Sequence, residues 1–329
     1  IRVGDNTSGA ECRLVVGKDV KIIAPASYGI AVFGKNTKQT LEVSGTVTAK
    51  EASAISGNGS AGFTATEITI NDGATITSEN NVAVYHPQAG TLTVKAATIT
   101  GRGGIEIKSG TANVNVAGAN IKATGNVEHT ENNDGTSSRG YAIAVVENPG
   151  YKGKPSAVIQ NGNFVGAMGI LSDGDVSADA KGNLEIHAGS FTVNVSDYVT
   201  GDTPVAATGE QEGTYVVGQS AINAVAKAGN DVRIVKGNVT LTDVPAGVTV
   251  IPNEGTTVVV NGKDISSSQY RDGYAVPQSS GYYYYQPTTD TKTDGTKGSP
   301  KTVDPGAALY GALALLSLTG MVALNGKKR

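Results

Sequence analysis

Large apolar side chains are scarce in this sequence of 329 residues, which contains no tryptophan, four phenylalanines and two methionines. Valine, isoleucine, threonine and alanine are plentiful, and there are 44 glycines. β-Branched residues favour strands, and glycine favours tight turns. The composition therefore predicts many thin, repetitive β layers in place of one thick globular core.

Cysteine and histidine are also rare. Cys12 is the single cysteine, so the chain cannot form an internal disulfide, and no histidine lies near it to activate a thiol nucleophile. The three histidines do not have the spacing of zinc ligands. We therefore expect no cofactor.

The charge balance argues against nucleic acid as a partner. The net charge is −3, and the cationic residues form no basic stripe along the repeats. Binding to phosphate backbones requires clustered cations.

A short apolar pattern recurs along the chain. Two apolar residues are separated by one residue, and a third follows five positions later, as in Leu92-x-Val94 with Ile99. The alternation is that of a strand with one buried face, and the small residues before the third position allow a bend. Five segments fit closely and three fit loosely; their third apolar residues are Ile99, Ile121, Phe164, Phe191 and Val239, and Val20, Val47 and Ile76.

The spacing of these repeats predicts a parallel β-solenoid. Ile76, Ile99 and Ile121 follow one another at nearly equal intervals, and each interval is the length of one solenoid coil. A second short apolar stretch, such as Ile105-Glu106-Ile107, follows many of the corners, so each coil has at least two strands. Each coil buries its apolar face only against its neighbours. A degenerate coil is expected around Tyr215-Val216-Val217.

This architecture resembles the right-handed parallel β-helix of the pectin-lyase-like class, from about Val3 to Ile265. The segments Ala83–Gln88 and Gly104–Gly110 are similar to motifs of large, repetitive, wall-anchored proteins of Gram-positive gut bacteria. The resemblance implies an all-β rod. Because the sequence begins without methionine and inside the repeat pattern, we expect a secretion signal and further coils upstream of Ile1.

Three parts are predicted along the chain: the β-helix over residues 1–265, a low-complexity wall-spanning linker over 266–298 and an anchoring segment over 299–329. The linker is rich in Ser, Thr, Asp, Lys, Gly and Pro, which cannot bury enough apolar area to fold. Its run Tyr282–Tyr285 is interpreted either as part of an extended linker or as an aromatic contact with sugar or with the last coil.

The anchoring segment has the sequence features of a stop-transfer segment, an apolar run followed by cations. An uncharged apolar run from Ala307 to Leu324 is followed by Lys327, Lys328 and Arg329. As a helix this run reaches roughly 27 Å, close to the thickness of a bilayer core. The terminal cations are expected to stay on the cytoplasmic side, which places the preceding chain outside the cell.

This tail resembles the cell-wall sorting signal of Gram-positive surface proteins, in which an LPxTG-type pentapeptide precedes the helix. The resemblance implies that a sortase cleaves after Thr302 and joins it to peptidoglycan. Ser299 stands where leucine is usual and Val303 where glycine is usual, so an unprocessed membrane anchor is the alternative. The predicted pentapeptide is Ser299, Pro300, Lys301, Thr302 and Val303.

Candidate ligand contacts come from polar residues next to buried positions of the repeats. Glu106 and Lys108 alternate with Ile105 and Ile107, so both are expected to point outward, either for solubility or as half of an acid/base site. Tyr85 and His86 lie beside a proline-containing turn. The polar stretch from Asn126 to Arg139 is predicted to be a loop that is mobile or touches a ligand.

A weak metal candidate is the acidic segment with Asp173, Asp175 and Asp179. Its spacing resembles the start of a calcium loop, but Ala178 and Leu184 stand where such a loop requires glycine and glutamate. A solvated turn is the favoured interpretation, and no metal site is expected.

These features favour a non-catalytic surface protein anchored to the Gram-positive envelope, acting as an adhesin, a glycan-binding stalk or a display scaffold. The expected partners are sortase, peptidoglycan, the membrane, and glycans or host surface molecules. The alternative is a surface polysaccharide lyase or glycoside hydrolase, which would gather carboxylates, or carboxylates with Arg or Lys, in one groove.

Overall fold

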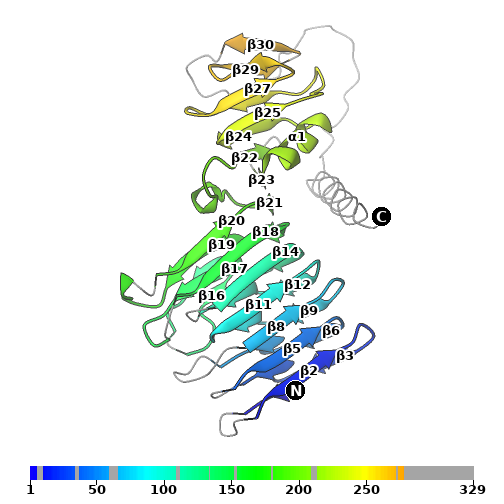
Figure 1. Cartoon of the computed structure of the whole chain (residues 1–329), viewed down its shortest axis with the longest axis vertical. Coiled ribbons are helices and arrows are strands. Elements are labelled where there is room, and N and C mark those ends of the chain that lie inside the picture. Colours follow the sequence, from blue (N-terminus) through cyan, green and yellow to red (C-terminus); the bar gives the residue numbers. More distant parts are fainter. Residues whose placement is uncertain are drawn as a thin grey trace, which may run out of the picture.

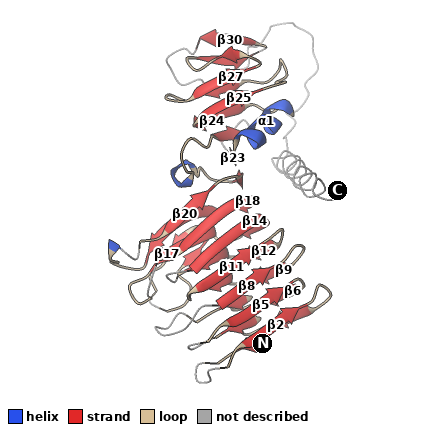
Figure 2. Ribbon diagram, in the orientation of Figure 1, coloured by secondary structure: helices blue, strands red, loops and turns tan. Residues whose placement is uncertain are grey.

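Strands stack along the long axis of the molecule (Figure 1), and they make up most of the described chain (Figure 2). Over residues 2–191 the strands form a parallel β-solenoid of about seven turns. The computed structural model describes residues 1–5, 10–33, 37–58, 66–108, 112–132, 134–151, 154–178, 181–208, 213–271 and 273–277.

One side of the solenoid is a seven-stranded parallel sheet. Its strands come from the short apolar stretches that follow the corners, and each pairs in parallel with the equivalent strand of the next coil. They are β1 (Arg2–Val3), β4 (Ile30–Val32), β7 (Ile55–Ser56), β10 (Val82–His86), β13 (Gly103–Ile107), β17 (Tyr141–Glu147) and β19 (Ala167–Ser172).

The opposite side has two strand positions per coil, separated by a corner. The first position is occupied by β2 (Cys12–Val16), β5 (Gln39–Val43), β8 (Thr66–Ile70), β11 (Gly90–Val94), the start of β14 (Ala112–Ala123), the start of β18 (Ser156–Val165) and β20 (Asn183–Ile186). The second is occupied by β3 (Lys21–Ala24), β6 (Thr46–Ala49), β9 (Thr75–Ser78), β12 (Thr98–Gly101), the ends of β14 and β18, and β21 (Gly189–Phe191).

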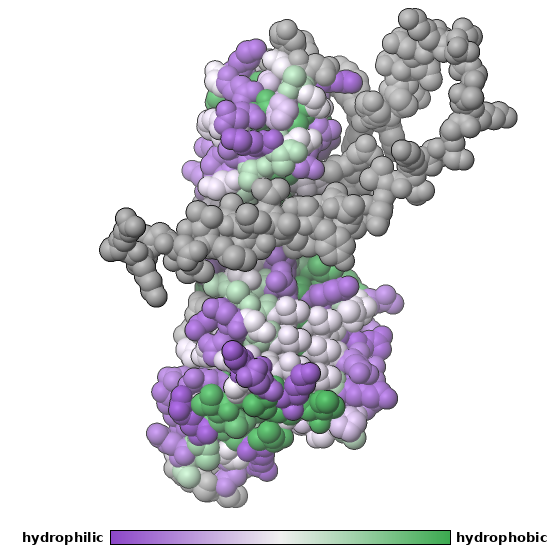
Figure 3. Space-filling view, turned by 90° about the vertical axis from the view of Figure 1, so that its right-hand side faces the viewer, coloured by the Kyte–Doolittle hydropathy of each residue, from purple (hydrophilic) through white to green (hydrophobic). Residues whose placement is uncertain are grey.

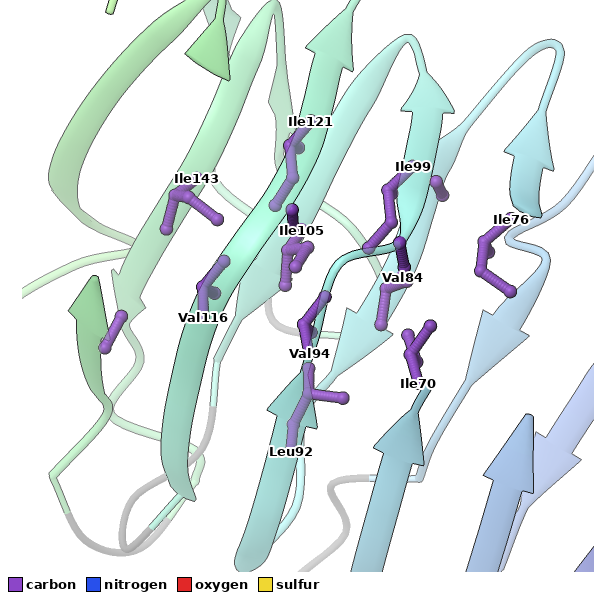
Figure 4. Close-up of a cluster of buried hydrophobic side chains, with 14 of the residues drawn as sticks. Ile70, Ile76, Val84, Leu92, Val94, Ile99, Ile105, Val116, Ile121 and Ile143 are labelled. Carbon is purple, nitrogen blue, oxygen red and sulfur yellow. The ribbon is translucent and has the colours of Figure 1, made fainter. Parts of the chain in front are cut away.

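Equivalent apolar residues of successive coils lie on top of one another and fill the interior (Figure 4). Ile99 pairs in register with Ile76 on one side and Ile121 on the other, and all three are buried. The rings of Phe164 and Phe191 stack with centroids 4.9 Å apart. The predicted repeat is therefore confirmed for the copies whose third apolar residues are Val47, Ile76, Ile99, Ile121, Phe164 and Phe191.

The first copy of the repeat differs from the prediction at one position. Ile22, and not Val20, pairs with Val47 of the next coil, while the side chain of Val20 is exposed. Val20 lies in a turn, where its backbone N–H donates to the carbonyl of Gly17. The pattern identified the coil but placed its third apolar residue two positions too early.

Beyond Phe191 the chain changes its pairing. β22 (Val205–Thr208) runs antiparallel to β23 (Thr214–Val217) and to β24 (Val232–Lys236), and β23 runs antiparallel to β21. The remaining elements are η2 (Ser196–Tyr198), α1 (Gln219–Lys227), β25 (Asn238–Leu241), β26 (Val250–Pro252), β27 (Thr257–Val260), β28 (Lys263–Asp264), β29 (Ser268–Arg271) and β30 (Tyr274–Pro277).

The parallel solenoid spans residues 2–191, whereas the prediction extended it to Ile265. The antiparallel strands β22 and β23 interrupt the stack, and parallel pairing returns beyond them between β24 and β26 and between β25 and β27. The segment around Tyr215–Val217 is an antiparallel strand and not a degenerate coil. The last repeat, with Val232, Ile234 and Val239, is buried as its alternation predicts, but in a second apolar cluster beneath α1. Alternation of apolar residues indicates that one face of a strand is buried, but it does not show whether the neighbouring strand is parallel or antiparallel.

Two strands, β29 and β30, fall inside the segment predicted as a linker from residue 266, so strand structure extends to Pro277. Across the ranges given above, no helix combines the length and apolarity needed to cross a bilayer. The predicted helix over 307–324, the pentapeptide Ser299–Val303 and the terminal cations Lys327, Lys328 and Arg329 lie outside the described residues, as does Tyr282–Tyr285.

Candidate functional site

A buried cluster of charged groups lies on the outer face of the seven-stranded sheet. It forms where the polar segment from Asn126 to Arg139 folds back over β13, with β15 (Glu128–His129) and β16 (Ser138–Arg139) paired as a short antiparallel ladder. The outer face would otherwise be open to water. We call this segment the covering loop, and its side chains and carbonyls complete the cluster.

Glu106 points outward from β13, as its alternation with Ile105 and Ile107 predicts, but the covering loop buries it completely. Its carboxylate accepts hydrogen bonds from the backbone N–H groups of Ser137 and Ser138, at 3.0 and 2.9 Å, and from the Ser138 hydroxyl at 2.6 Å. The prediction that outward charges on this strand meet solvent is therefore wrong. Local alternation defines the face of a strand but not what covers it.

Lys108 follows the same strand and is equally buried. Its Nζ donates to the carbonyl oxygens of Asn132 and Gly135, at 2.6 and 2.7 Å, and lies 2.6 Å from Oδ2 of Asp173. Oε1 of Glu106 is 4.0 Å from the same nitrogen. An unpaired buried ammonium is strongly unfavourable, so these contacts fix the covering loop in place.

Asp173 follows the end of β19, two coils beyond β13. It accepts a hydrogen bond from Nδ2 of Asn148 at 3.1 Å, and Nε2 of His129 lies 2.9 Å from its other oxygen. Burial raises the pKa of Asp173, but the hydrogen bonds from Lys108, His129 and Asn148 outweigh it and hold this pKa below its usual range. For Glu106 burial dominates and raises the pKa, with only partial opposition from Ser138 and Lys108.

Two tyrosines border the charged cluster. The hydroxyl oxygens of Tyr85 and Tyr151 lie 3.5 Å apart, and Tyr151 donates to Oδ1 of Asp134 at 3.3 Å. Tyr85 pairs in register with Glu106 on the neighbouring strand, so both belong to the outer face. Burial raises the pKa of both tyrosines, which keeps their hydroxyls protonated.

His86 lies apart from this cluster although it is the next residue after Tyr85. It pairs with Ile107 and shares the inward parity of Val84, so its ring lies inside the solenoid. The ring is fully buried, and neither nitrogen has a hydrogen-bond partner in the described structure. Burial lowers the pKa of His86 to about 4, so the ring is neutral at physiological pH.

The weak metal candidate is not assembled as a site. Asp173 is committed to Lys108, His129 and Asn148, Asp175 is exposed, and Asp179 lies outside the described residues. Where the structure places side chains, it contains no group of three or more His, Cys, Asp or Glu residues arranged to hold a metal.

The chemistry available to the cluster is that of a closed ionic network. Glu106, Lys108 and Asp173 bring two carboxylates and one ammonium together, as a lyase or hydrolase would require. However, all three side chains are fully buried under the covering loop and bonded to protein atoms. The predicted candidates Tyr85, Glu106 and Lys108 are thus neighbours, whereas His86 is on the other side of the sheet.

Several partners of this network could not be identified from local sequence. Asp173 is distant from Lys108 along the chain, and Ser137 and Ser138 reach Glu106 only because the covering loop folds back. The sequence held two signals of this cluster. Charged residues alternate with Ile105 and Ile107, and a long polar insertion follows before the next repeat.

A partly exposed candidate surface lies on the second strand position of the opposite side. Val47, Ile76 and Ile99 point inward there, so the threonines that flank them point outward in two rows that continue from coil to coil. Figure 3 shows a pale area of neutral residues on the solenoid. We define the threonine surface as Thr46, Thr48, Thr75, Thr77, Thr98 and Thr100.

A second exposed feature lies at the N-terminal end. The first coil exposes the apolar side chains of Val15, Val20 and Ile23. An apolar patch appears toward that end of the face in Figure 3.

Comparisons with known proteins identify no relative. No protein-family model, no curated protein and no solved structure matches the chain.

The buried ring of His86 predicts an acid-sensitive fold. Between pH 6.5 and about 4 the unfolded chain binds a proton at this residue and the folded chain does not, so stability falls as the pH falls through this window. The loss attributable to His86 is about 3 kcal/mol over the full window. Denaturant unfolding at several pH values should show it, and His86→Leu should remove it.

His187 is the matched control, because its ring is partly exposed and lies beside Glu185. His187→Gln should leave the acid-dependent loss intact. An identical pH profile for wild type and His86→Leu would contradict the account of His86.

Proposed function

We propose that this chain is a non-catalytic surface protein of a Gram-positive envelope, in which the solenoid is a stiff stalk that presents the threonine surface to glycans. The observation that carries the proposal is the division of polar groups between two sides. The ionic cluster of Glu106, Lys108 and Asp173 on one side is buried and bonded to protein, while the second strand position of the opposite side presents rows of neutral hydroxyls. Seven coils at about 4.8 Å make a rod of roughly 30 Å.

The threonine surface has the spacing and chemistry to bind a polymer of neutral sugars. Its hydroxyls repeat at the separation of neighbouring strands, about 4.8 Å along the stack. Each hydroxyl both donates and accepts hydrogen bonds, which suits sugar hydroxyls. Because the coils are held in fixed register, the surface loses little conformational entropy when a ligand binds.

The anchoring part of the proposal is supported by the tail sequence. The pentapeptide Ser299–Val303, the apolar run 307–324 and the terminal cations follow the order of a sortase substrate. In this proposal Thr302 is joined to peptidoglycan, and the segment after Pro277 carries the stalk through the wall. A right-handed winding of the solenoid, which parallel crossovers strongly favour, is also part of the proposal.

Incubation of the full chain with a panel of plant and host glycans tests the display function. We expect retention on at least one neutral glycan without turnover. Replacing two hydroxyls, in Thr77→Val with Thr100→Val, should weaken the affinity behind this retention by roughly thirtyfold, since each hydrogen bond contributes about 1 kcal/mol.

The control is Thr257→Val, which changes an exposed strand threonine outside the solenoid and should leave retention unchanged. New reducing ends or unsaturated sugars would establish the enzyme alternative. Retention on no glycan would contradict the glycan-binding role.

Extraction from cells tests the anchor. If Thr302 is joined to peptidoglycan, muralytic digestion releases the protein and mild detergent does not. Release by detergent alone would show an unprocessed membrane anchor and would exclude sortase processing at Val303.

A further inference from the structure

The contact between the side chains of Lys108 and Asp173 is short and completely buried. Nζ of Lys108 is 2.6 Å from Oδ2 of Asp173, and both side chains have no exposed surface. Glu106 places a second carboxyl 4.0 Å from the same nitrogen and is also fully buried. An amine, a carboxyl that it can attack and a second carboxyl that can carry a proton are thus held together away from water.

We propose that Nζ of Lys108 and Cγ of Asp173 become joined by an amide bond, formed within the chain without an external enzyme. The bond would be an intramolecular cross-link between the end of β13 and the segment after β19. This proposal does not depend on the proposed display function, because it concerns only the buried cluster.

The step balances without an oxidant or a co-reactant. A proton first passes from the Lys108 ammonium to the Asp173 carboxylate along their short contact, which leaves a neutral amine and a carboxylic acid. Nζ then attacks Cγ, Glu106 takes a proton from the nitrogen and returns one to the departing hydroxyl, and water leaves. Counted from the ion pair, one N–C bond forms and one C–O bond breaks, two N–H bonds break and the two O–H bonds of the departing water form, and both charges disappear.

Two physical effects favour this reaction at this site. Groups held in reacting geometry can have effective concentrations of about 10⁵–10⁸ M. Burial also penalises the separated charges of the ion pair more than the neutral amide that replaces them. The raised pKa of Glu106 is consistent with a carboxyl that can hold the transferred proton.

The cross-link would connect three successive coils. β13 pairs with β17, and β17 pairs with β19, so the bond would run across the outer face of the sheet from the first of these strands to the third. The covering loop contacts both linked residues, because the carbonyls of Asn132 and Gly135 accept from Lys108 and the ring of His129 contacts Asp173. Coils of a solenoid otherwise contact only their neighbours, so this bond would prevent them from separating.

Intact-mass measurement of the purified full chain tests the proposal. We expect a mass lower by one water than the mass of the sequence. Proteolysis under denaturing conditions should then yield one linked species containing the Lys108 and Asp173 peptides. A chain of full mass, with both peptides recovered free, would overturn the proposal.

The linked peptide is the decisive observation, because Asp173 precedes Gly174 and an Asp-Gly pair can also lose water by closing on its own backbone. A deficit confined to an unlinked Asp173 peptide would therefore overturn the cross-link. Lys108→Arg and Asp173→Ala should each restore the full mass, and persistence of the deficit in either variant would likewise overturn it.

Glu106→Gln tests the proton carrier. Glutamine keeps an oxygen that accepts from Ser137 and Ser138 but cannot shuttle a proton, so the linked form should accumulate at least tenfold more slowly in refolded protein. Circular dichroism checks that the variant is folded. Cross-linking at the wild-type rate would overturn the role given to Glu106.

Discussion

The fold depends on the burial of equivalent apolar residues between successive coils. No single coil can hide Leu92, Val94 and Ile99 from water, but the parallel register places each of them against the same kind of residue above and below. Thin coils of β-branched residues are sufficient for this arrangement, which explains how a chain without tryptophan forms a continuous core. The residues on the outer faces of the coils do not contribute to this core, so their sequence can vary.

The seven-stranded sheet uses this freedom in an unusual way. Its outer face holds Glu106, Lys108 and Asp173 under a loop whose carbonyl, amide and hydroxyl groups replace water. Removing one partner from such a network leaves an uncompensated buried charge, which typically costs about 3–5 kcal/mol. The network therefore fixes one arrangement of the covering loop, and it joins residues from coils that share no direct strand pairing.

The parts of the fold that sequence predicts are those set by local periodicity. Alternation around Ile99 and Ile121 correctly indicates the buried face and the coil length. It does not reveal the antiparallel strands β22 and β23 that interrupt the stack after Phe191, so Val232 and Ile234 appeared to continue the same solenoid. The burial of Glu106 was missed because it depends on a distant loop. The candidate residues were found, but their partners and their inaccessibility were not.

Amide hydrogen exchange of the full chain, resolved by peptide, tests the central claim most directly. If the coils are stacked and the covering loop is pinned, amides of β8, β11 and β14 exchange slowly, and so do those of Ser137 and Ser138, which donate to Glu106. Slow exchange in the strands with fast exchange at these two serines would contradict the closed ionic network. Fast exchange throughout residues 39–123 would contradict the stacked solenoid itself.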